Sequence, residues 1–325
     1  MKSLLRIVTL ATIVLLCPGC PGAGGKWFEN QTISIGDTTR YFRYYVPKNL
    51  ATPCPVVYLL HGGTQDMEAI FDRNAGGTQE WQDIADDAGF LLVVPNGVNA
   101  ETGEAWGDNQ NWRDCRGDAP AIDTGADDVA FISALIDWAQ ANFNVDADRV
   151  YSTGASNGGK MSYRLARELD DRIAAVAAFI ANEAAVDICA DPDLPVSVFI
   201  CNGTADPLQQ WEGGAIPGGR GTSISALATR DYWITQNDCD NAPSDVVMYP
   251  DLDPNDGCTI SSELFTGGDE GTEVMFYTVE GGGHTMPSID YRVPAWLLNL
   301  LQLGNQNGDI EGARHAWAFL ERQRL

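Results

Sequence analysis

The sequence predicts one α/β domain with a mostly parallel central sheet, helices on both faces of the sheet and an antiparallel hairpin at the N-terminal side. Three observations lead to this prediction. Short, continuously apolar runs recur along the chain, which is typical of strands buried on both faces. Stretches with helical periodicity separate these runs, as they do in successive β–α–β units. The length of 325 residues suits one large domain, because α/β architectures commonly exceed about 200 residues.

The first 25 residues are predicted to form a secretory signal peptide, which leaves residues 26–325 as the folded domain. Lys2 and Arg6 flank a short apolar run over residues 7–16, and small turn-forming residues follow it. The run is too short to span a bilayer, so we expect no integral membrane segment once the signal is removed. The protein is therefore expected to be secreted or periplasmic. The alternative is a lipoprotein signal, with a lipid anchor on one of two cysteines, Cys17 or Cys20.

The composition argues against two classes of partner. Forty-five acidic and 20 basic residues give a formal charge of −25, which repels nucleic acid and anionic membrane surfaces. The acidic residues are spread along the chain without long runs, which is typical of a solvated surface. With only three histidines and no C-x-x-C spacing after the signal, the sequence argues against a zinc site, and no metal or cofactor is expected.

The folded domain is expected to open with an antiparallel hairpin. Residues 32–35 and 39–46 alternate apolar and polar side chains around the turn-forming pair Gly36-Asp37. Six buried strands are expected to follow, each a short apolar run: residues 56–60, 90–94, 149–153, 174–180, 196–201 and 274–279.

Helices are expected between these strands. Apolar residues recur at helical spacing from Val129 to Phe143, directly after Asp127 and Asp128, whose charges suit a helix N-terminus. This segment is predicted to be a crossover helix. Further helical segments are expected at residues 161–169, 223–236 and 310–320.

A candidate nucleophile lies between a strand and a helix. Residues 154–159 read Gly-Ala-Ser-Asn-Gly-Gly and match G-x-S-x-G, directly after the strand predicted at 149–153. A nucleophile elbow needs small residues on both sides of the serine, because the turn is tight and the backbone at the serine is strained. Ser156 is therefore predicted to be the nucleophile. The alternative is a structural serine in a Gly-rich loop.

The base is predicted by elimination. A strand–elbow–helix nucleophile is followed in the chain by an acid and then by a histidine, both on loops after later strands. His61 precedes Ser156, and His315 lies in the predicted C-terminal helix. His284 follows the strand predicted at 274–279 and is therefore the expected general base.

Asp206 is predicted to be the acid of the triad. It follows the strand at 196–201, which is the position from which a carboxylate can orient the imidazole of His284. A turn aspartate before a proline is the alternative role for Asp206. Other carboxylates either precede that strand or lie in a Pro-rich loop with no strand before it: Asp191, Asp193, Asp251 and Asp253.

An oxyanion hole is expected beside the serine. The turn His61-Gly62-Gly63-Thr64 follows the strand at 56–60, where this kind of site supplies one backbone amide. The second amide comes from the residue after the nucleophile. The amides of Gly63 and Asn157 are therefore the predicted pair, and a glycine turn without this role is the alternative.

These motifs, taken in order, resemble the polyhydroxybutyrate depolymerase and feruloyl esterase family of secreted α/β hydrolases. The resemblance covers nearly all of residues 26–325 and is carried by five segments: 60–65, 127–132, 154–159, 203–207 and 281–287. It implies the α/β-hydrolase fold for the catalytic domain, and it implies that Ser156, Asp206 and His284 form the triad. Two positions depart from the family pattern, because Gly63 stands where relatives usually carry cysteine and Met286 where they carry tryptophan.

Two disulfides are expected. Relatives carry cysteines near the site at the places of Cys115 and Cys189, so the resemblance implies a bond between these two. A second bond is predicted between Cys239 and Cys258, because they flank a Pro- and Asp-rich loop with little apolar content and relatives carry cysteines at matching places. Cys201 lies within a predicted strand and is expected to stay free.

Three tryptophans and one methionine are candidates for substrate contact. Trp106, Trp112 and Trp211 lie in loops after predicted strands, where ligands bind in open α/β sheets, and they could form an aromatic floor. Ordinary loop packing is the alternative. Met286 stands two residues after the predicted base and is the fourth candidate.

The expected activity is hydrolysis of carboxylic esters through an acyl-enzyme, without a cofactor. The resemblance implies an ester partner that is either a small molecule or a polymer: feruloyl or acetyl esters on plant polysaccharide, or short hydroxyalkanoate polyesters. Two alternatives remain open. A serine exopeptidase would use the same triad with a pocket for the substrate amine, and an inactive hydrolase fold would serve only as a binding protein.

Overall fold

The computed structural model describes residues 25–72 and 76–325. The predicted signal peptide, with Cys17 and Cys20, lies outside the described residues, so the predicted signal and lipid anchor stay predictions. Within the described ranges, no helix combines the length and the apolar composition needed to cross a membrane.

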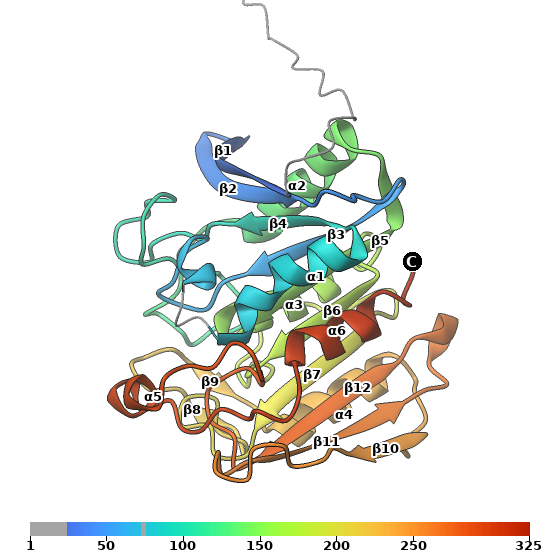
Figure 1. Ribbon diagram of the computed structural model, residues 1–325. Coiled ribbons are helices and arrows are strands. Elements are labelled where there is room, and N and C mark those ends of the chain that lie inside the picture. The colour runs from blue at the N-terminus through green and yellow to red at the C-terminus, as the bar shows by residue number, and fades with distance from the viewer. Residues whose placement is uncertain (1–24, 73–75) are drawn as a thin grey trace, which may run out of the picture.

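A ten-stranded sheet runs through the molecule in the order β1-β2-β4-β3-β5-β6-β7-β12-β11-β10 (Figure 1). The six strands from β4 to β12 in this order are mutually parallel. Their bounds are β3 (Cys54–Leu60), β4 (Leu91–Pro95), β5 (Val145–Ala155), β6 (Ala175–Phe179), β7 (Ser197–Gly203) and β12 (Val274–Glu280). All six were predicted from their apolar runs, and the mostly parallel sheet of an α/β hydrolase is confirmed.

Antiparallel strands extend the sheet on both sides. The predicted hairpin is formed by β1 (Lys26–Ile35) and β2 (Thr38–Val46), and β2 joins the sheet antiparallel to β4. On the opposite side, β11 (Thr259–Phe265) pairs antiparallel with β12, and β10 (Asp245–Met248) forms the edge. A separate two-stranded ribbon is made by β8 (Gly214–Ala215) and β9 (Thr222–Ser223).

Helices cover both faces of the sheet, as predicted. The face that carries Val56 and Tyr58 packs against three helices: α2 (Asp128–Asn142), α3 (Asn157–Glu168) and α4 (Ala226–Gln236). The face that carries Val57 and Leu59 packs against α1 (Glu80–Ala88) and α6 (Gly312–Leu320). The remaining helices among the described residues are α5 (Ala295–Leu301) and three short 3₁₀ turns, Ala69–Phe71, Gly76–Gln79 and Asp269–Gly271.

The acidic pair at the start of α2 has two distinct roles. Asp127 caps the helix, because its side chain accepts a hydrogen bond from the Ala130 amide at 2.9 Å. Asp128 turns into the core instead and forms a buried ion pair with Arg40 of β2 at 2.7 Å. It also accepts from the Arg113 amide at 2.8 Å, so this carboxylate fixes the hairpin and the loop before α2 to one another.

One of the two predicted disulfides is present. Cys115 and Cys189 are bonded across a sequence separation of 74 residues. Cys201 of β7 is free and buried, as expected.

The predicted bond between Cys239 and Cys258 is wrong, because both thiols are free. Cys258 directly precedes β11, whereas the Asp240 amide next to Cys239 donates to Thr266 O, which follows β11. The seven residues of β11 therefore separate the two cysteines, a span of roughly 20 Å. The two thiols also belong to the apolar cores on opposite faces of the sheet. A disulfide needs Cα atoms within about 7 Å of each other.

Candidate active site

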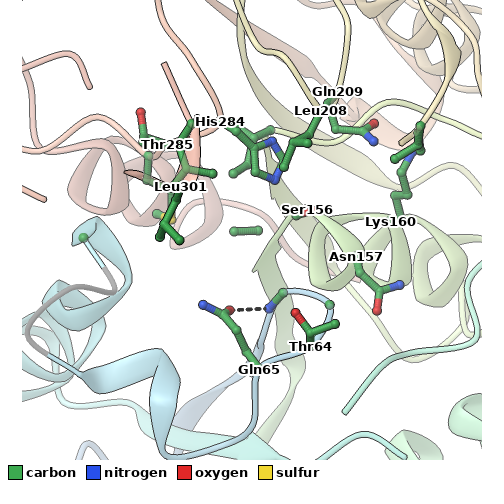
Figure 2. Close-up of a pocket in the computed structure, with 18 of the residues that line it drawn as sticks. Thr64, Gln65, Ser156, Asn157, Lys160, Leu208, Gln209, His284, Thr285 and Leu301 are labelled. Atoms are coloured by element: carbon green, nitrogen blue, oxygen red, sulfur yellow. Dashed lines mark hydrogen bonds between the residues drawn. The ribbon is translucent and has the colours of Figure 1, made fainter. Parts of the chain in front are cut away.

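A cavity of about 510 Å³ opens at the carboxyl ends of the central parallel strands (Figure 2). Loops that follow β3, β5, β7 and β12 contribute to its wall, which is where open α/β sheets bind their ligands. Polar lining residues include Thr64, Gln65, Ser156, Asn157, Lys160, Gln209 and His284; apolar ones include Ile122, Ile180, Leu208, Ile216, Met286, Val293, Leu301 and Leu303.

Ser156 lies in a sharp turn between β5 and α3. Its backbone has φ 56° and ψ −118°, on the positive-φ side that residues with a Cβ avoid. The turn is held because the Ser156 amide donates to Phe179 O at 2.9 Å and the Lys160 amide donates to Ser156 O at 3.0 Å. A strained backbone at a serine that lines a cavity is the geometry of a nucleophile elbow.

The glycines around Ser156 are required by close packing against neighbouring strands. A Cβ on Gly158 would lie 2.2 Å from Leu60 O, and one on Gly154 would lie 2.6 Å from the same oxygen. A Cβ on Gly159 would lie 2.8 Å from the Cβ of Ala181. The G-x-S-x-G-G spacing therefore lets the elbow sit directly on the end of β3.

Asp206 and His284 form a buried hydrogen-bonded pair. Asp206 Oδ2 lies 2.7 Å from His284 Nδ1, and the Asp206 side chain is only 1 % exposed. The other carboxylate oxygen, Oδ1, accepts from the amides of Leu208 and Gln209, both at 2.8 Å. The carboxylate thus acts only as an acceptor, which leaves His284 Nδ1 as the donor and Nε2 as the free acceptor.

The loops that carry this pair are fastened together by their backbones. The Ala205 amide donates to Gly282 O at 2.9 Å, and the Gly281 amide donates to the Thr204 hydroxyl at 2.9 Å. A Cβ on Gly203 would lie 2.3 Å from Gly282 O, so only glycine permits this approach. The Gly-rich sequences around Asp206 and His284 therefore serve to bring the two loops into contact.

Ser156 and His284 both line the cavity, but in this structure no hydrogen bond joins their side chains among the described residues. Figure 2 shows both residues at the cavity wall. Nucleophile–base contacts are often long before substrate binds and shorten in the complex.

Two backbone amides near Ser156 have no acceptor within the described chain. Asn157 is the first residue of α3, so its amide has no acceptor within the helix. In the turn after β3, the Gly62 amide donates to Gln65 Oε1 at 2.9 Å and the Thr64 amide to Gln110 O at 2.8 Å. The Gly63 amide between them has no acceptor in the described chain. Both residues line the cavity, where they can hold an oxyanion.

The side chain of Asn157 and the ring of Trp112 hold these two amides in place. Asn157 Oδ1 accepts from the Trp112 amide at 2.7 Å, and its Nδ2 donates to Trp112 O at 2.9 Å. Trp112 Nε1 in turn donates to His61 O at 2.9 Å. Trp112 is fully buried and is absent from the cavity wall, so its predicted place in an aromatic floor is wrong.

His61 fixes the same turn from behind. Its Nε2 accepts from the Gly97 amide at 3.0 Å, and its Nδ1 lies 2.7 Å from Gly62 O. Burial lowers the pKa of His61 to about 4, so the ring is neutral and can accept through Nε2. From the sequence, His61 was only excluded as the base and placed in the oxyanion turn. Its position directly after a buried strand was the available signal for a structural role.

The other aromatic candidates also lie away from the cavity. Trp106 is 48 % exposed and packs edge-on against Tyr41. Trp211 packs against Phe276 within the core beneath α4. Met286 does line the cavity and is buried. Trp112 and Trp211 are packing residues, whereas Trp106 is half-exposed outside the cavity wall. Whether a loop tryptophan lies inward or outward depends on contacts that the sequence does not display.

Buried charges surround one side of the cavity. Lys160 donates to Asn182 O and to the hydroxyl of Ser223, the latter at 2.8 Å. Burial lowers the pKa of Lys160 and raises that of Glu183, the nearby carboxylate with which it interacts. Gln209 Oε1 accepts from the same Ser223 hydroxyl at 3.3 Å, so this network extends to the loop that carries Asp206.

Comparison with known proteins agrees with this geometry. The model of the Esterase family, described as "Putative esterase", matches residues 34–243. The chain is 29 % identical to the "Putative esterase NocK" of Nocardia uniformis subsp. tsuyamanensis over 82 % of this chain and 76 % of that protein. It is 26 % identical to feruloyl esterase D of Neurospora crassa over 98 % of this chain and 95 % of that protein.

Among solved structures, the acetyl xylan esterase from Aspergillus awamori superposes with a TM-score of 0.52 at 16 % identity, over 79 % of this chain and 94 % of that chain. At this level of identity the likeness concerns the fold.

Proposed function

Because the chain belongs to the Esterase family, we propose that it hydrolyses carboxylic esters by a serine mechanism with Ser156 as nucleophile, His284 as general base and Asp206 as its orienting acid. The observation that carries this proposal is the 2.7 Å hydrogen bond between Asp206 Oδ2 and His284 Nδ1, with His284 and the strained Ser156 lining one cavity. The three residues come from three separate loops, after β5, β7 and β12, and they follow the chain order that this mechanism requires.

In the proposed reaction, Ser156 Oγ attacks the ester carbonyl carbon while His284 Nε2 accepts the hydroxyl proton. The amides of Gly63 and Asn157 stabilise the oxyanion that forms on the carbonyl oxygen. The C–O bond to the alcohol then breaks, and His284 returns its proton to the leaving alcohol. Water attacks the acyl-enzyme with His284 again as the base, and the free acid departs from Ser156.

The proposed substrates are feruloyl or acetyl esters on plant polysaccharide, or short hydroxyalkanoate polyesters. The first class is supported by the names of relatives, which include a feruloyl esterase and an acetylxylan esterase. The cavity of about 510 Å³ has the size of a site for an aromatic acid or a sugar unit. We propose that the protein acts outside the cytoplasm, since the Cys115–Cys189 disulfide suits an oxidising compartment.

The two alternatives fit the site less well. An exopeptidase that binds the substrate amine needs a carboxylate to hold the ammonium group, and no Asp or Glu of the described chain lines the cavity. An inactive binding protein would have no need for the strained elbow, the buried Asp206–His284 pair and the free amides together.

The test is an assay of the purified protein on p-nitrophenyl acetate, butyrate and octanoate, on methyl ferulate and on an amino-acid nitroanilide. We expect ester hydrolysis and no nitroanilide cleavage. Ser156→Ala should reduce ester hydrolysis by about 10⁶-fold while the protein stays folded, because nucleophile and base act as one unit. Ser261→Ala on β11 is the matched control and should keep the wild-type rate. An undiminished rate in Ser156→Ala would refute the proposal.

A further inference from the structure

The charge of the cavity wall is opposite to that of the chain. The sequence has 45 acidic and 20 basic residues, yet the charged side chains that line the cavity in the described structure include Arg116, Lys160 and Arg220 and no carboxylate. A surface sampled at random from this chain would contain about twice as many acids as bases. The charged side chains at the wall are therefore all basic.

Two of these three cations already have partners within the protein. Arg116 pairs with the buried carboxylate of Asp114, with Nη2 and Oδ2 2.5 Å apart. Lys160 donates to Asn182 O and Ser223 Oγ and lies within the field of Glu183. Neither group is free to neutralise a ligand.

Arg220 is different. Every other arginine in residues 25–72 and 76–325 forms an ion pair with an Asp or Glu. The guanidinium of Arg220 has neither an ion pair nor a hydrogen bond to a described residue, although it is only partly exposed and carboxylates outnumber cations in the chain.

The backbone of Arg220 is fixed while its side chain is left unpaired. Arg220 lies between glycines at φ 70° and 81° in the loop that joins β8 to β9. Ile216 donates from its amide to Gly221 O at 2.8 Å, and Arg116 Nη1 donates to Arg220 O. Arg116 follows Cys115 directly, so the disulfide restrains the residue that holds this loop.

We propose that Arg220 binds a carboxylate carried by the ester, so that the site prefers anionic esters to neutral ones. This inference rests on the proposed function. The planar guanidinium presents two parallel N–H donors that match a carboxylate, and such charge-assisted pairs are about twice as strong as neutral hydrogen bonds. Ile122 and Ile216 line the same cavity and supply apolar contact for the uncharged part of such a substrate.

The test compares kcat/KM for anionic and neutral esters of similar shape. For a charge on the acyl part the pair is 4-nitrophenyl hydrogen glutarate and 4-nitrophenyl valerate. For a charge on the alcohol part the pair is 4-acetoxybenzoate and its methyl ester. We expect the wild type to prefer the anion in at least one pair, and Arg220→Gln to reduce the anionic-to-neutral ratio in that pair at least about tenfold, mainly through KM.

Arg322→Gln is the matched control. It removes the same charge, but Arg322 pairs with Glu273, which precedes β12, whereas His284 follows that strand at the other end of the sheet. The control should keep the wild-type ratio. If Arg220→Gln keeps it too, or if the wild type prefers the neutral ester in both pairs, the proposal is wrong.

Binding measured without turnover separates this proposal from the proposed function. In the Ser156→Ala variant, calorimetry should detect binding of 4-acetoxybenzoate or of 4-nitrophenyl hydrogen glutarate. Adding Arg220→Gln to this variant should weaken that binding about tenfold or more. Equal binding in both variants would overturn the anion site even if esters are hydrolysed. Failure of the wild type to hydrolyse any ester would instead overturn the proposed function.

Discussion

Asp206 and His284 are 78 positions apart in the chain, yet Asp206 Oδ2 lies 2.7 Å from His284 Nδ1 in a buried environment. If this pair orients the base, Asp206→Asn should reduce kcat by about 10⁴-fold, because an amide in this position favours the wrong histidine tautomer. Steady-state kinetics on p-nitrophenyl butyrate would measure the loss. Asp253→Asn, which changes a carboxylate paired with Arg292, is the control and should keep kcat. If Asp253→Asn reduced kcat and Asp206→Asn did not, Asp206 would not be the acid of the triad.

The packing of the elbow against β3 predicts a large difference between two glycine substitutions. Gly158→Ala would place a Cβ 2.2 Å from Leu60 O, so the elbow or the strand must move. Gly103 has a positive φ of 74°, unlike Gly158, but nothing lies within 4 Å of a Cβ added there. We expect Gly158→Ala to lower the free energy of unfolding by at least about 2 kcal/mol more than Gly103→Ala. Urea denaturation would measure both, and equal effects would contradict the close packing.

The observed disulfide predicts which cysteine matters for stability. Cys115→Ser should cost about 4 kcal/mol on the chain-entropy model, because the bond closes a loop of 74 residues. It should also loosen the Arg116 loop beside the cavity. Cys239→Ala, which removes a buried free thiol, is the comparison. Its effect on the free energy of unfolding should be the same with and without reductant. Peptide mapping without reduction should recover one disulfide, and a Cys239–Cys258 peptide pair would contradict the structure.

The buried His61 predicts a specific response to acid. Because burial lowers its pKa from 6.5 to about 4, the unfolded chain binds a proton on this residue at a higher pH than the folded chain does. Its contribution to stability is therefore complete above pH 6.5 and is lost as the pH falls toward 4. NMR titration should show the His61 imidazole still neutral at pH 5, with His61→Gln assigning the signal. A His61 resonance that titrates near pH 6.5 would contradict the burial.

The central strands could be predicted from the sequence because burial on both faces leaves a direct mark, a run without polar residues. The edge strands leave no such mark. β10 reads Asp-Val-Val-Met with exposed side chains, and β11 alternates buried and exposed positions. The sequence analysis therefore did not identify them as strands, and they are recognised only from the pairing of β10 with β11 and of β11 with β12.

In the candidate site, too, some features are marked in the sequence and others are not. Chain order and local turn sequence were enough to propose Ser156, Asp206 and His284, because each lies in the loop that follows a central strand. The position of a loop side chain depends on contacts from distant segments. Trp112 looked like a substrate platform, but it lies behind the oxyanion turn because it donates to His61 O. Arg220 carried no signal at all, since its lack of a partner is visible only when the ion pairs of the other arginines are known.

The two open edges of the sheet bear on how concentrated solutions of this protein behave. β10 ends the sheet with only four residues, and its exposed Val246 and Met248 are the kind of side chains through which edge strands of separate molecules join. The strand is short, Pro250 follows it closely, and each molecule carries a formal charge of −25. At low ionic strength this repulsion should keep the edges apart. Concentrated salt screens it, and self-association through β10 should then become measurable by light scattering.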